Sequence, residues 1–193
     1  VKWYRESAER ENAQAQCNLG CCYEYGIGVG KDFAKAAEWY QKSAEQGNCR
    51  AQYNLGYCYD IGEGVEKNSA KAVEWYRKSA ENGNALAQFN LGICYEYRQS
   101  VTQSKATAAE WYHKAADQGN ASAQYKLGVF YENGYGVTQD KEQAMQWYKK
   151  AADQGNESAK KAIDRMQSGG MGTAVAAGVA AAGVGLLWKI LNS

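Results

Sequence analysis

Apolar and polar residues follow one another along this chain with the spacing of amphipathic helices. Ala51, Leu55 and Cys58 fall three or four residues apart, which is the period of one helix face. After a Gly-Glu-Gly turn, the same spacing resumes with Ala72 and Tyr76. The pattern predicts a hairpin in which a first helix, helix A, covers about 49–60 and a second, helix B, lies between positions 68 and 83.

This hairpin repeats with a period of 36 residues. The pair Trp-Tyr recurs in one phase, at 3–4, 39–40, 75–76, 111–112 and 147–148. A single hairpin is too small to bury its apolar face, so neighbouring hairpins must stack. We therefore predict an all-α fold, a right-handed α/α superhelical solenoid over residues 1–167. Its parts are a partial repeat at 1–11, full repeats at 12–47, 48–83, 84–119 and 120–155, and a capping helix at 156–167.

The residue before each predicted helix B is a good helix cap, although the four residues differ chemically. They are Asp32, Asn68, Ser104 and Asp140. Side chains of these types accept a hydrogen bond from a backbone N–H of the first helical turn. Variation within this rule indicates capping rather than catalysis, and Gly83 is expected just beyond the other end of helix B.

Residues 168–193 depart from the repeat and form a Gly/Ala-rich apolar tail, which we interpret as a C-terminal apolar helix. The stretch 173–191 is near the length that spans a bilayer, and Lys189 is its one charge. Ala and Gly, however, contribute little to membrane insertion. Three interpretations stay open: a membrane-spanning or membrane-inserted helix, a helix packed on the end of the solenoid, and a disordered tail.

The charge of the chain is nearly balanced, with 22 Lys and Arg against 21 Asp and Glu. Such a balance gives no basic surface for nucleic acid, so we expect no nucleic-acid partner. The chain opens at Val1 in the middle of a repeat, and we therefore expect it to be a fragment of a longer protein.

The combined pattern A-x-x-x-L-G-x-x-Y-x-x-G-x-G-V and K-A-x-E-W-Y-x-K-[SA]-A-x-x-G resembles the Sel-1-like repeat, a branch of the tetratricopeptide superfamily. It is carried by Ala51, Leu55, Gly56, Tyr59, Gly62, Gly64, Val65, Lys71, Ala72, Trp75, Tyr76 and Gly83. The resemblance covers positions 1 to about 167. It implies an α/α superhelix that acts as an adaptor in protein complexes.

A secreted, cysteine-rich bacterial branch of that family links each helix B to the next helix A by a disulfide. The resemblance maps the bridging positions onto Ala44 and Gln52, Ala80 and Gln88, and Ala116 and Gln124. None of these is a cysteine. The chain thus departs from that branch and from the penicillin-binding activity proposed for it.

The six cysteines of this chain replace apolar residues of the repeat. Cys22, Cys58 and Cys94 share one phase with Phe130. Equivalent residues of adjacent repeats are expected about 10 Å apart, too far for a bridge or a shared metal. We expect buried free thiols and an intracellular reducing compartment. A disulfide and a metal site are the alternatives, and we predict neither a metal nor another cofactor.

Several other side chains have both a chemical and a structural interpretation. His113 is the only histidine, and its equivalents are polar, so we place it on the solvent side of helix B. Three Glu and Lys pairs have the helix-stabilising i, i+4 order: Glu38–Lys42, Glu74–Lys78 and Glu110–Lys114. Trp39, Trp75, Trp111 and Trp147 suit core packing better than an aromatic ligand site. We therefore predict no catalytic residue and no enzyme.

A partner surface follows from the helical wheel of helix A. A stripe away from the core combines asparagines with aromatic and aliphatic residues, a mixture that suits an extended peptide. On the predicted concave face it comprises Asn18, Tyr25, Arg50, Asn54, Tyr57, Ile61, Asn90, Ile93, Tyr97 and Lys126. The competing interpretation is that the asparagines only bond neighbouring backbone.

The residues thus favour an interaction scaffold that binds an unknown protein or peptide, with membrane attachment through 173–191 as an open addition. A hydrolase-type enzyme or enzyme subunit and a purely structural spacer are the alternatives. An enzyme would need a nucleophile beside a base, and the sequence shows neither.

Overall fold

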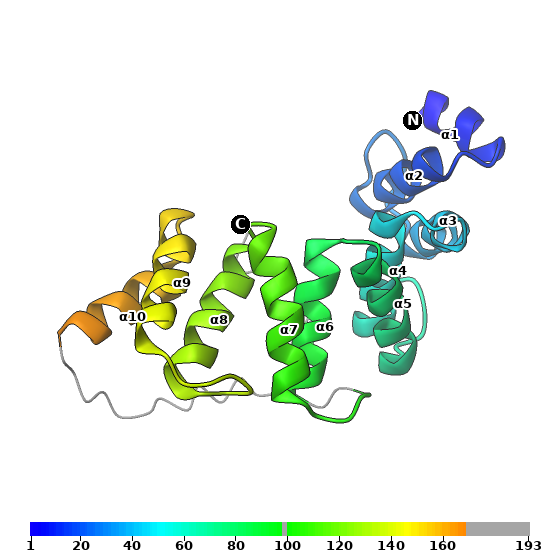
Figure 1. The fold of residues 1–193 in the computed structure, drawn as a ribbon. Helices are drawn as coiled ribbons and strands as arrows, with labels where there is room; N and C mark the ends of the chain where they lie inside the picture. The colour runs from blue at the N-terminus through cyan, green and yellow to red at the C-terminus, as the bar shows by residue number, and fades with distance from the viewer. Residues whose placement is uncertain (98–99, 169–193) are drawn as a thin grey trace. The chain divides into compact units, whose positions relative to one another are not determined.

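The computed structural model describes residues 1–97 and 100–168, and the predicted C-terminal apolar helix lies outside these ranges. The described residues form a solenoid of consecutive helices without strands (Figure 1). The helices are α1 Lys2–Glu9, α2 Ala13–Tyr25, α3 Phe33–Glu45, α4 Cys49–Ile61, α5 Ser69–Glu81, α6 Ala85–Tyr97, α7 Lys105–Asp117, α8 Ala121–Asn133, α9 Lys141–Asp153 and α10 Glu157–Gln167. This confirms the all-α repeat solenoid that the 36-residue period predicts.

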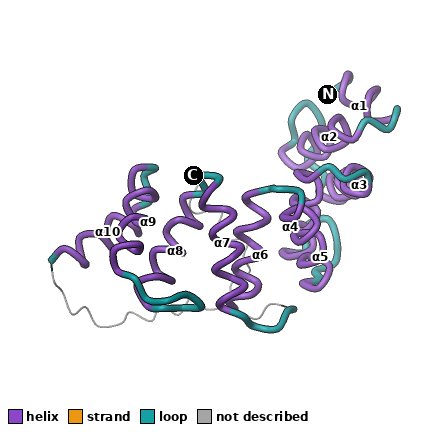
Figure 2. Tube along the Cα trace, viewed as in Figure 1, coloured by secondary structure: helices purple, strands orange, loops and turns teal. Residues whose placement is uncertain are grey.

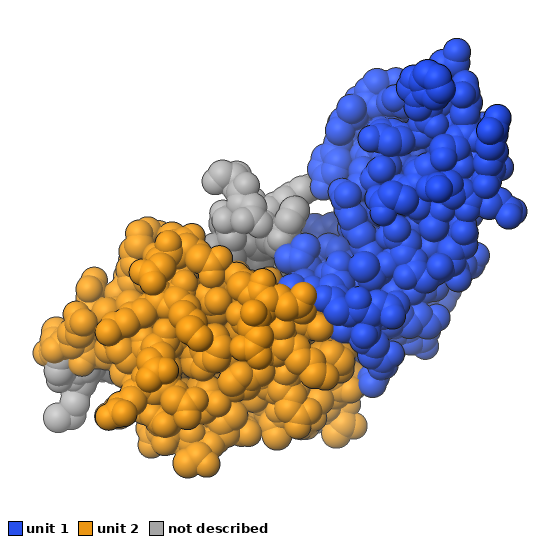
Figure 3. All heavy atoms as spheres, turned by 45° about the horizontal axis from the view of Figure 1, so that its top comes forward, with its two compact units in different colours: residues 1–87, 182–193 blue, residues 88–181 orange. Residues whose placement is uncertain are grey.

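Within unit 1, each helix from α1 to α5 packs beside the next one, and within unit 2 the same holds from α7 to α10 (Figure 2). The even-numbered helices are helix A of the repeats, and the odd-numbered helices are helix B. The chain divides into two compact units (Figure 3). Unit 1 comprises described residues 1–87, and unit 2 comprises described residues 88–97 and 100–168. Because the relative position of the units is not determined, each is described by itself.

The predicted caps are present at the start of each helix B. The carboxylate of Asp32 accepts from the backbone N–H of Lys35 at 3.0 Å, and the side chain of Asn68 accepts from Lys71 at 3.0 Å. Ser104 and Asp140 cap α7 and α9 in the same way. At the other end of α5, Gly83 has a φ of 85°, a left-handed conformation that favours glycine.

The Leu-Gly pair of helix A has a packing reason. A tyrosine of the following helix B lies flat on the glycine, and a Cβ atom added to Gly128 would be 2.4 Å from the Tyr148 ring. Gly56 and Tyr76 form an equivalent contact in unit 1. The four tyrosines at this position, Tyr40, Tyr76, Tyr112 and Tyr148, are fully buried. Glycine therefore allows the helix backbone to approach a large aromatic ring.

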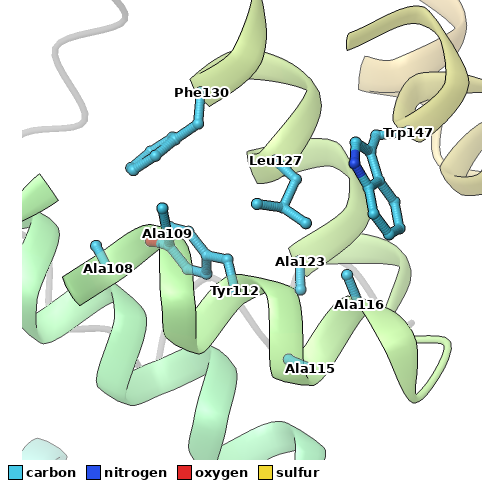
Figure 4. Packing of buried hydrophobic residues seen from close by; sticks show 9 residues of the cluster. All are labelled: Ala108, Ala109, Tyr112, Ala115, Ala116, Ala123, Leu127, Phe130 and Trp147. Atoms are coloured by element: carbon cyan, nitrogen blue, oxygen red, sulfur yellow. The ribbon is translucent and has the colours of Figure 1, made fainter. Parts of the chain in front are cut away.

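Figure 4 shows the core of unit 2, where Leu127 and Phe130 of α8 face α7. The rings of Tyr112 and Phe130 meet edge to face, with centroids 5.3 Å apart. Around them lie alanines of α7 and α8, and Trp147 of α9 closes the cluster. Small residues bring the helices together while large ones fill the remaining space.

Hydrogen bonds occupy the positions onto which the family resemblance maps disulfides. The amide of Gln52 donates to the carbonyl of Ala44 at 3.2 Å in unit 1. In unit 2, Gln124 donates to the carbonyl of Ala116 at 3.1 Å. Both glutamines are buried. Each bond thus joins the end of helix B to the next helix A without a covalent link.

The predicted i, i+4 ion pairs on helix B are replaced by another contact. No ion pair between Glu38 and Lys42 is present; instead, the Lys42 ammonium lies 4.4 Å from the centre of the Trp39 ring. Corresponding lysine–tryptophan contacts of 4.0–4.1 Å occur in the other full repeats, at Lys78, Lys114 and Lys150. The lysine prefers the half-buried ring three residues earlier, where the cation–π attraction is less screened than an exposed ion pair.

The tryptophans and His113 also have defined environments. Trp147 is buried, and Trp39 and Trp75 are half-buried against the cores of unit 1. The solvent-facing placement of His113 is wrong. Its ring packs edge to face on Trp147 and Tyr131, with its Nε2 atom 2.9 Å from the Tyr131 hydroxyl. Its repeat equivalents are polar, but an aromatic ring has room between these two side chains.

Candidate partner-binding surface on helix A

The predicted surface residues of unit 1 come from α2 and α4. Asn18, Asn54, Tyr57 and Ile61 are half-buried, and Arg50 and Tyr25 are exposed. The carbonyl of the Asn18 side chain accepts from Gln14 at 3.2 Å. This asparagine therefore bonds a neighbouring side chain rather than the backbone, as a residue of a recognition surface can do.

A sulfur atom lies at the centre of this surface. The Cys21 Sγ atom accepts from the Arg50 guanidinium at 3.4 Å and lies 3.3 Å from the Tyr40 hydroxyl oxygen, whose proton is donated to Glu24. A hydrogen bond from Cys17 lowers the pKa of Cys21 most, burial opposes this, and the Tyr40 hydroxyl and the Arg50 charge lower the pKa further. The net shift is downward, so Cys21 is a thiolate at lower pH than an ordinary cysteine.

Next to Cys21, the surface contains a shallow hollow of about 40 Å³. It is lined by Glu24, Tyr25, Tyr53, Asn54 and Tyr57. Burial and then the Glu24 carboxylate raise the pKa of Tyr25 to about 12. The hollow thus combines a carboxylate, hydroxyls, an amide and aromatic rings.

The predicted residues of unit 2 are placed less uniformly. Tyr97 is exposed and Ile93 is half-buried. Asn90 is only 7% exposed, so it offers little surface to a partner. The Lys126 ammonium lies 3.1 and 3.0 Å from the two carboxylate oxygens of Glu96 and is therefore engaged within the chain. The assignment of the ten residues to partner binding stays a prediction.

A row of carboxylates on helix A is absent from the sequence prediction. Each accepts a hydrogen bond from the buried tyrosine sixteen residues later: Glu24 from Tyr40, Asp60 from Tyr76, Glu96 from Tyr112 and Glu132 from Tyr148. The signal was in the sequence, since every full repeat has an acid in this phase. It was missed because the partner lies on the other helix.

All six cysteines are free thiols in the structure. Among the described residues, no group of His, Cys, Asp and Glu side chains could hold a metal ion. None of the described helices is both long enough and apolar enough to cross a bilayer. The proposed membrane segment 173–191 lies outside the described residues.

The family model of the Sel1 repeat matches four consecutive stretches of the sequence, residues 13–48, 49–84, 85–120 and 121–156. The chain belongs to the Sel1 repeat family. This confirms the resemblance drawn from the repeated Leu-Gly and Trp-Tyr pairs. Sel1 repeat proteins are generally protein-interaction scaffolds. No curated protein matches the chain.

Two solved structures of Sel1 repeat proteins are similar over most of the chain. One is a protective antigen of uropathogenic Escherichia coli, with 37% identity, a TM-score of 0.83 and coverage of 89% of this chain. The other is a Sel1 repeat protein from Oxalobacter formigenes, with 38% identity, a TM-score of 0.76 and coverage of 81%. The chain spans 37% of the first protein and 65% of the second.

A Helicobacter pylori cysteine-rich protein is more distant. It shares 26% identity and a TM-score of 0.55, and the match covers 68% of this chain and 95% of that protein. The fold is thus shared with a cysteine-rich relative. The hydrogen bonds of Gln52 and Gln124 show how this chain joins its helices without cysteines at those positions.

Proposed function

We propose that this Sel1 repeat protein binds an extended segment of a partner protein on the helix A surface, the predicted concave face of the solenoid. The observation that carries the proposal is a pair of exposed tyrosines, Tyr25 and Tyr97, which are 59% and 50% exposed. They occupy equivalent positions in two repeats whose other tyrosines are buried or half-buried. Exposed tyrosines provide contact area at low entropic cost and are enriched at binding surfaces.

The polar neighbours of these tyrosines support a peptide rather than a flat apolar partner. Asn54 and Asn18 can donate to and accept from the backbone of an extended segment. The hollow beside Tyr25 gives room for a side chain. A structural spacer would need none of these features.

The hydrolase alternative is less well supported. Arg50, Asn54 and Cys17 donate hydrogen bonds to Cys21. Donors stabilise a thiolate, but catalysis by a nucleophilic cysteine usually also needs a positioned group that transfers protons. The arrangement therefore favours a binding surface.

A random-peptide display library panned on the full chain tests the proposal. We expect peptides to be selected and to bind the Tyr25→Ala/Tyr97→Ala variant at least tenfold more weakly. The matched control is Trp3→Ala, which removes a ring that is 82% exposed on α1, a helix B, and should leave binding unchanged. The proposal fails if no peptide is selected, or if the double variant binds as well as the control.

Two further parts of the proposal concern location. We propose a reducing compartment, because six free thiols suit it, and membrane attachment through residues 173–191. Carbonate extraction of membranes from cells that make the full chain tests the attachment. Release of the protein into the soluble fraction would exclude a spanning helix.

A further inference from the structure

The same Glu-Tyr pair ends helix A in one repeat of each unit. In unit 1 it is Glu24 and Tyr25 of α2, and in unit 2 it is Glu96 and Tyr97 of α6. Both carboxylates accept a hydrogen bond from the buried tyrosine of the next helix B, and both tyrosines of the pair are exposed. The two pairs are therefore held in the same way.

In unit 2 the pair binds a cation. The Lys126 ammonium lies 3.1 and 3.0 Å from the Glu96 oxygens and 3.0 Å from the Tyr97 hydroxyl, and 5.0 Å from the centre of the Tyr97 ring. Burial alone would lower the pKa of Lys126, but Glu96 and Tyr97 outweigh it and the pKa is raised. The pair thus holds a charged ammonium group in a half-buried place.

In unit 1 the chain supplies no such cation. The repeat equivalent of Lys126 is Asn54, which is neutral, and the hollow lined by Glu24, Tyr25 and Asn54 lies there. A cation of the same surface, Arg50, donates to Cys21 instead. Its guanidinium forms no ion pair with Glu24 in the described part of the chain.

The remaining carboxylates of the row do not share this arrangement. Glu132 is already paired with Arg165. Asp60 is only 6% exposed and is followed by Ile61 rather than by a tyrosine. Among the four carboxylates that accept from a buried tyrosine, Glu24 is therefore the one that is half-buried, is followed by a tyrosine, and forms no ion pair in the described part of the chain.

We propose that the hollow at Glu24 and Tyr25 is a receptor for one lysine side chain of the partner segment, in the place that Lys126 takes beside Glu96. This inference rests on the proposed function, because it specifies one residue of the segment that the helix A surface binds. A volume of about 40 Å³ accommodates an ammonium group, which is about the size of a water molecule.

The physical reason is preorganisation. The Tyr40 hydroxyl fixes the Glu24 carboxylate before a ligand arrives, and the tyrosine ring and hydroxyl of Tyr25 supply cation–π attraction and an acceptor. A half-buried carboxylate attracts a cation more strongly than an exposed one, because it is less screened by water. The site selects for charge and for the length of the lysine side chain.

The peptides selected on the full chain provide the probe. We expect lysine to be enriched at one fixed position, and its replacement by norleucine, which is uncharged and of similar length, to weaken binding about tenfold. The norleucine peptide should bind wild type and the Glu24→Gln variant equally. The lysine peptide should bind Glu24→Gln about tenfold more weakly than wild type. Gln at 24 still accepts the Tyr40 hydrogen bond, so the fold is retained.

Two variants make the test specific. Asn54→Lys supplies the chain with its own ammonium beside Glu24 and should block the lysine peptide without removing the carboxylate. Glu132→Gln removes an equivalent carboxylate charge that Arg165 already neutralises, and it should leave binding unchanged.

Two results would overturn the proposed lysine site but not the proposed scaffold function. One is selection of peptides that share no lysine, and the other is a lysine peptide that binds Glu24→Gln or Asn54→Lys as tightly as wild type. Failure to select any peptide would instead refute the proposed function itself.

Discussion

The substitution Gly128→Ala tests whether the Leu-Gly pair exists for close packing. A Cβ atom there would lie 2.4 Å from two carbons of the Tyr148 ring, whereas ordinary carbon contacts are about 3.5–4.0 Å. The ring would have to move by about 1 Å. It has little freedom to do so, because Tyr148 is fully buried and its hydroxyl donates to Glu132 at 2.7 Å.

Two opposing effects determine how much stability Gly128→Ala loses. Forcing an extra methyl group into a filled core costs about 1–3 kcal/mol, and the upper part of that range, about 2–3 kcal/mol, applies here because the Tyr148 ring has little freedom to move. Alanine favours a helix interior over glycine by about 1 kcal/mol, which offsets part of this cost. We expect the free energy of unfolding to fall by about 1–2 kcal/mol, and Tm to fall by about 2–8 °C for a chain of this size.

Thermal and urea unfolding, followed by far-ultraviolet circular dichroism, measure this loss. Gly30→Ala, in the loop between α2 and α3, is the control for the loss of backbone freedom that any glycine-to-alanine substitution brings, because a Cβ atom at Gly30 would meet nothing within 4 Å and its φ is not left-handed. If Gly128→Ala is as stable as wild type or more stable, helix propensity outweighs any packing cost and the packing argument for Leu-Gly is refuted.

Three further predictions concern charged groups. Lys126→Met leaves the half-buried Glu96 carboxylate without its cation. The free energy of unfolding measured in urea should therefore fall by about 3 kcal/mol, and an added Glu96→Gln should restore most of it. Cys21 should be alkylated by iodoacetamide at lower pH than Cys58, whose pKa burial and then Glu24 raise to about 12; the reverse order in peptide mass spectra would contradict the assignment. Burial raises the pKa of Asp60, so the folded protein binds its proton more tightly than the unfolded chain and loses stability as pH rises through that pKa. Asp60→Asn should therefore raise Tm at neutral pH and leave it unchanged in acid, as melts over a pH series would show.

Features that depend on one helix could be predicted from the sequence. The N-caps at Asp32 and Asn68 and the left-handed Gly83 are of this kind, because each acts within a few residues of its position. The helix bounds followed from the same local rules. The 36-residue period then supplied the fold, since equivalent residues must pack in equivalent ways.

Features that depend on a competition between two partners could not be predicted. Lys42 has Glu38 four residues before it and Trp39 three residues before it, and the sequence alone does not say which it contacts. His113 was misplaced for a related reason, since Tyr131 and Trp147 lie on other helices. In both cases an aromatic ring determines which neighbour the side chain contacts.

The carboxylate row shows how a repeat protein can separate structure from recognition. Every buried tyrosine of helix B needs an acceptor for its hydroxyl, and in each full repeat a carboxylate on helix A supplies it. What varies is the residue that faces the acid from the next helix A: Lys126 neutralises Glu96, whereas Asn54 leaves Glu24 open. The proposal at Glu24 thus follows from one difference between repeats: the hydrogen bond to the buried tyrosine fixes the carboxylate, and the facing residue determines whether a cation of the chain neutralises it.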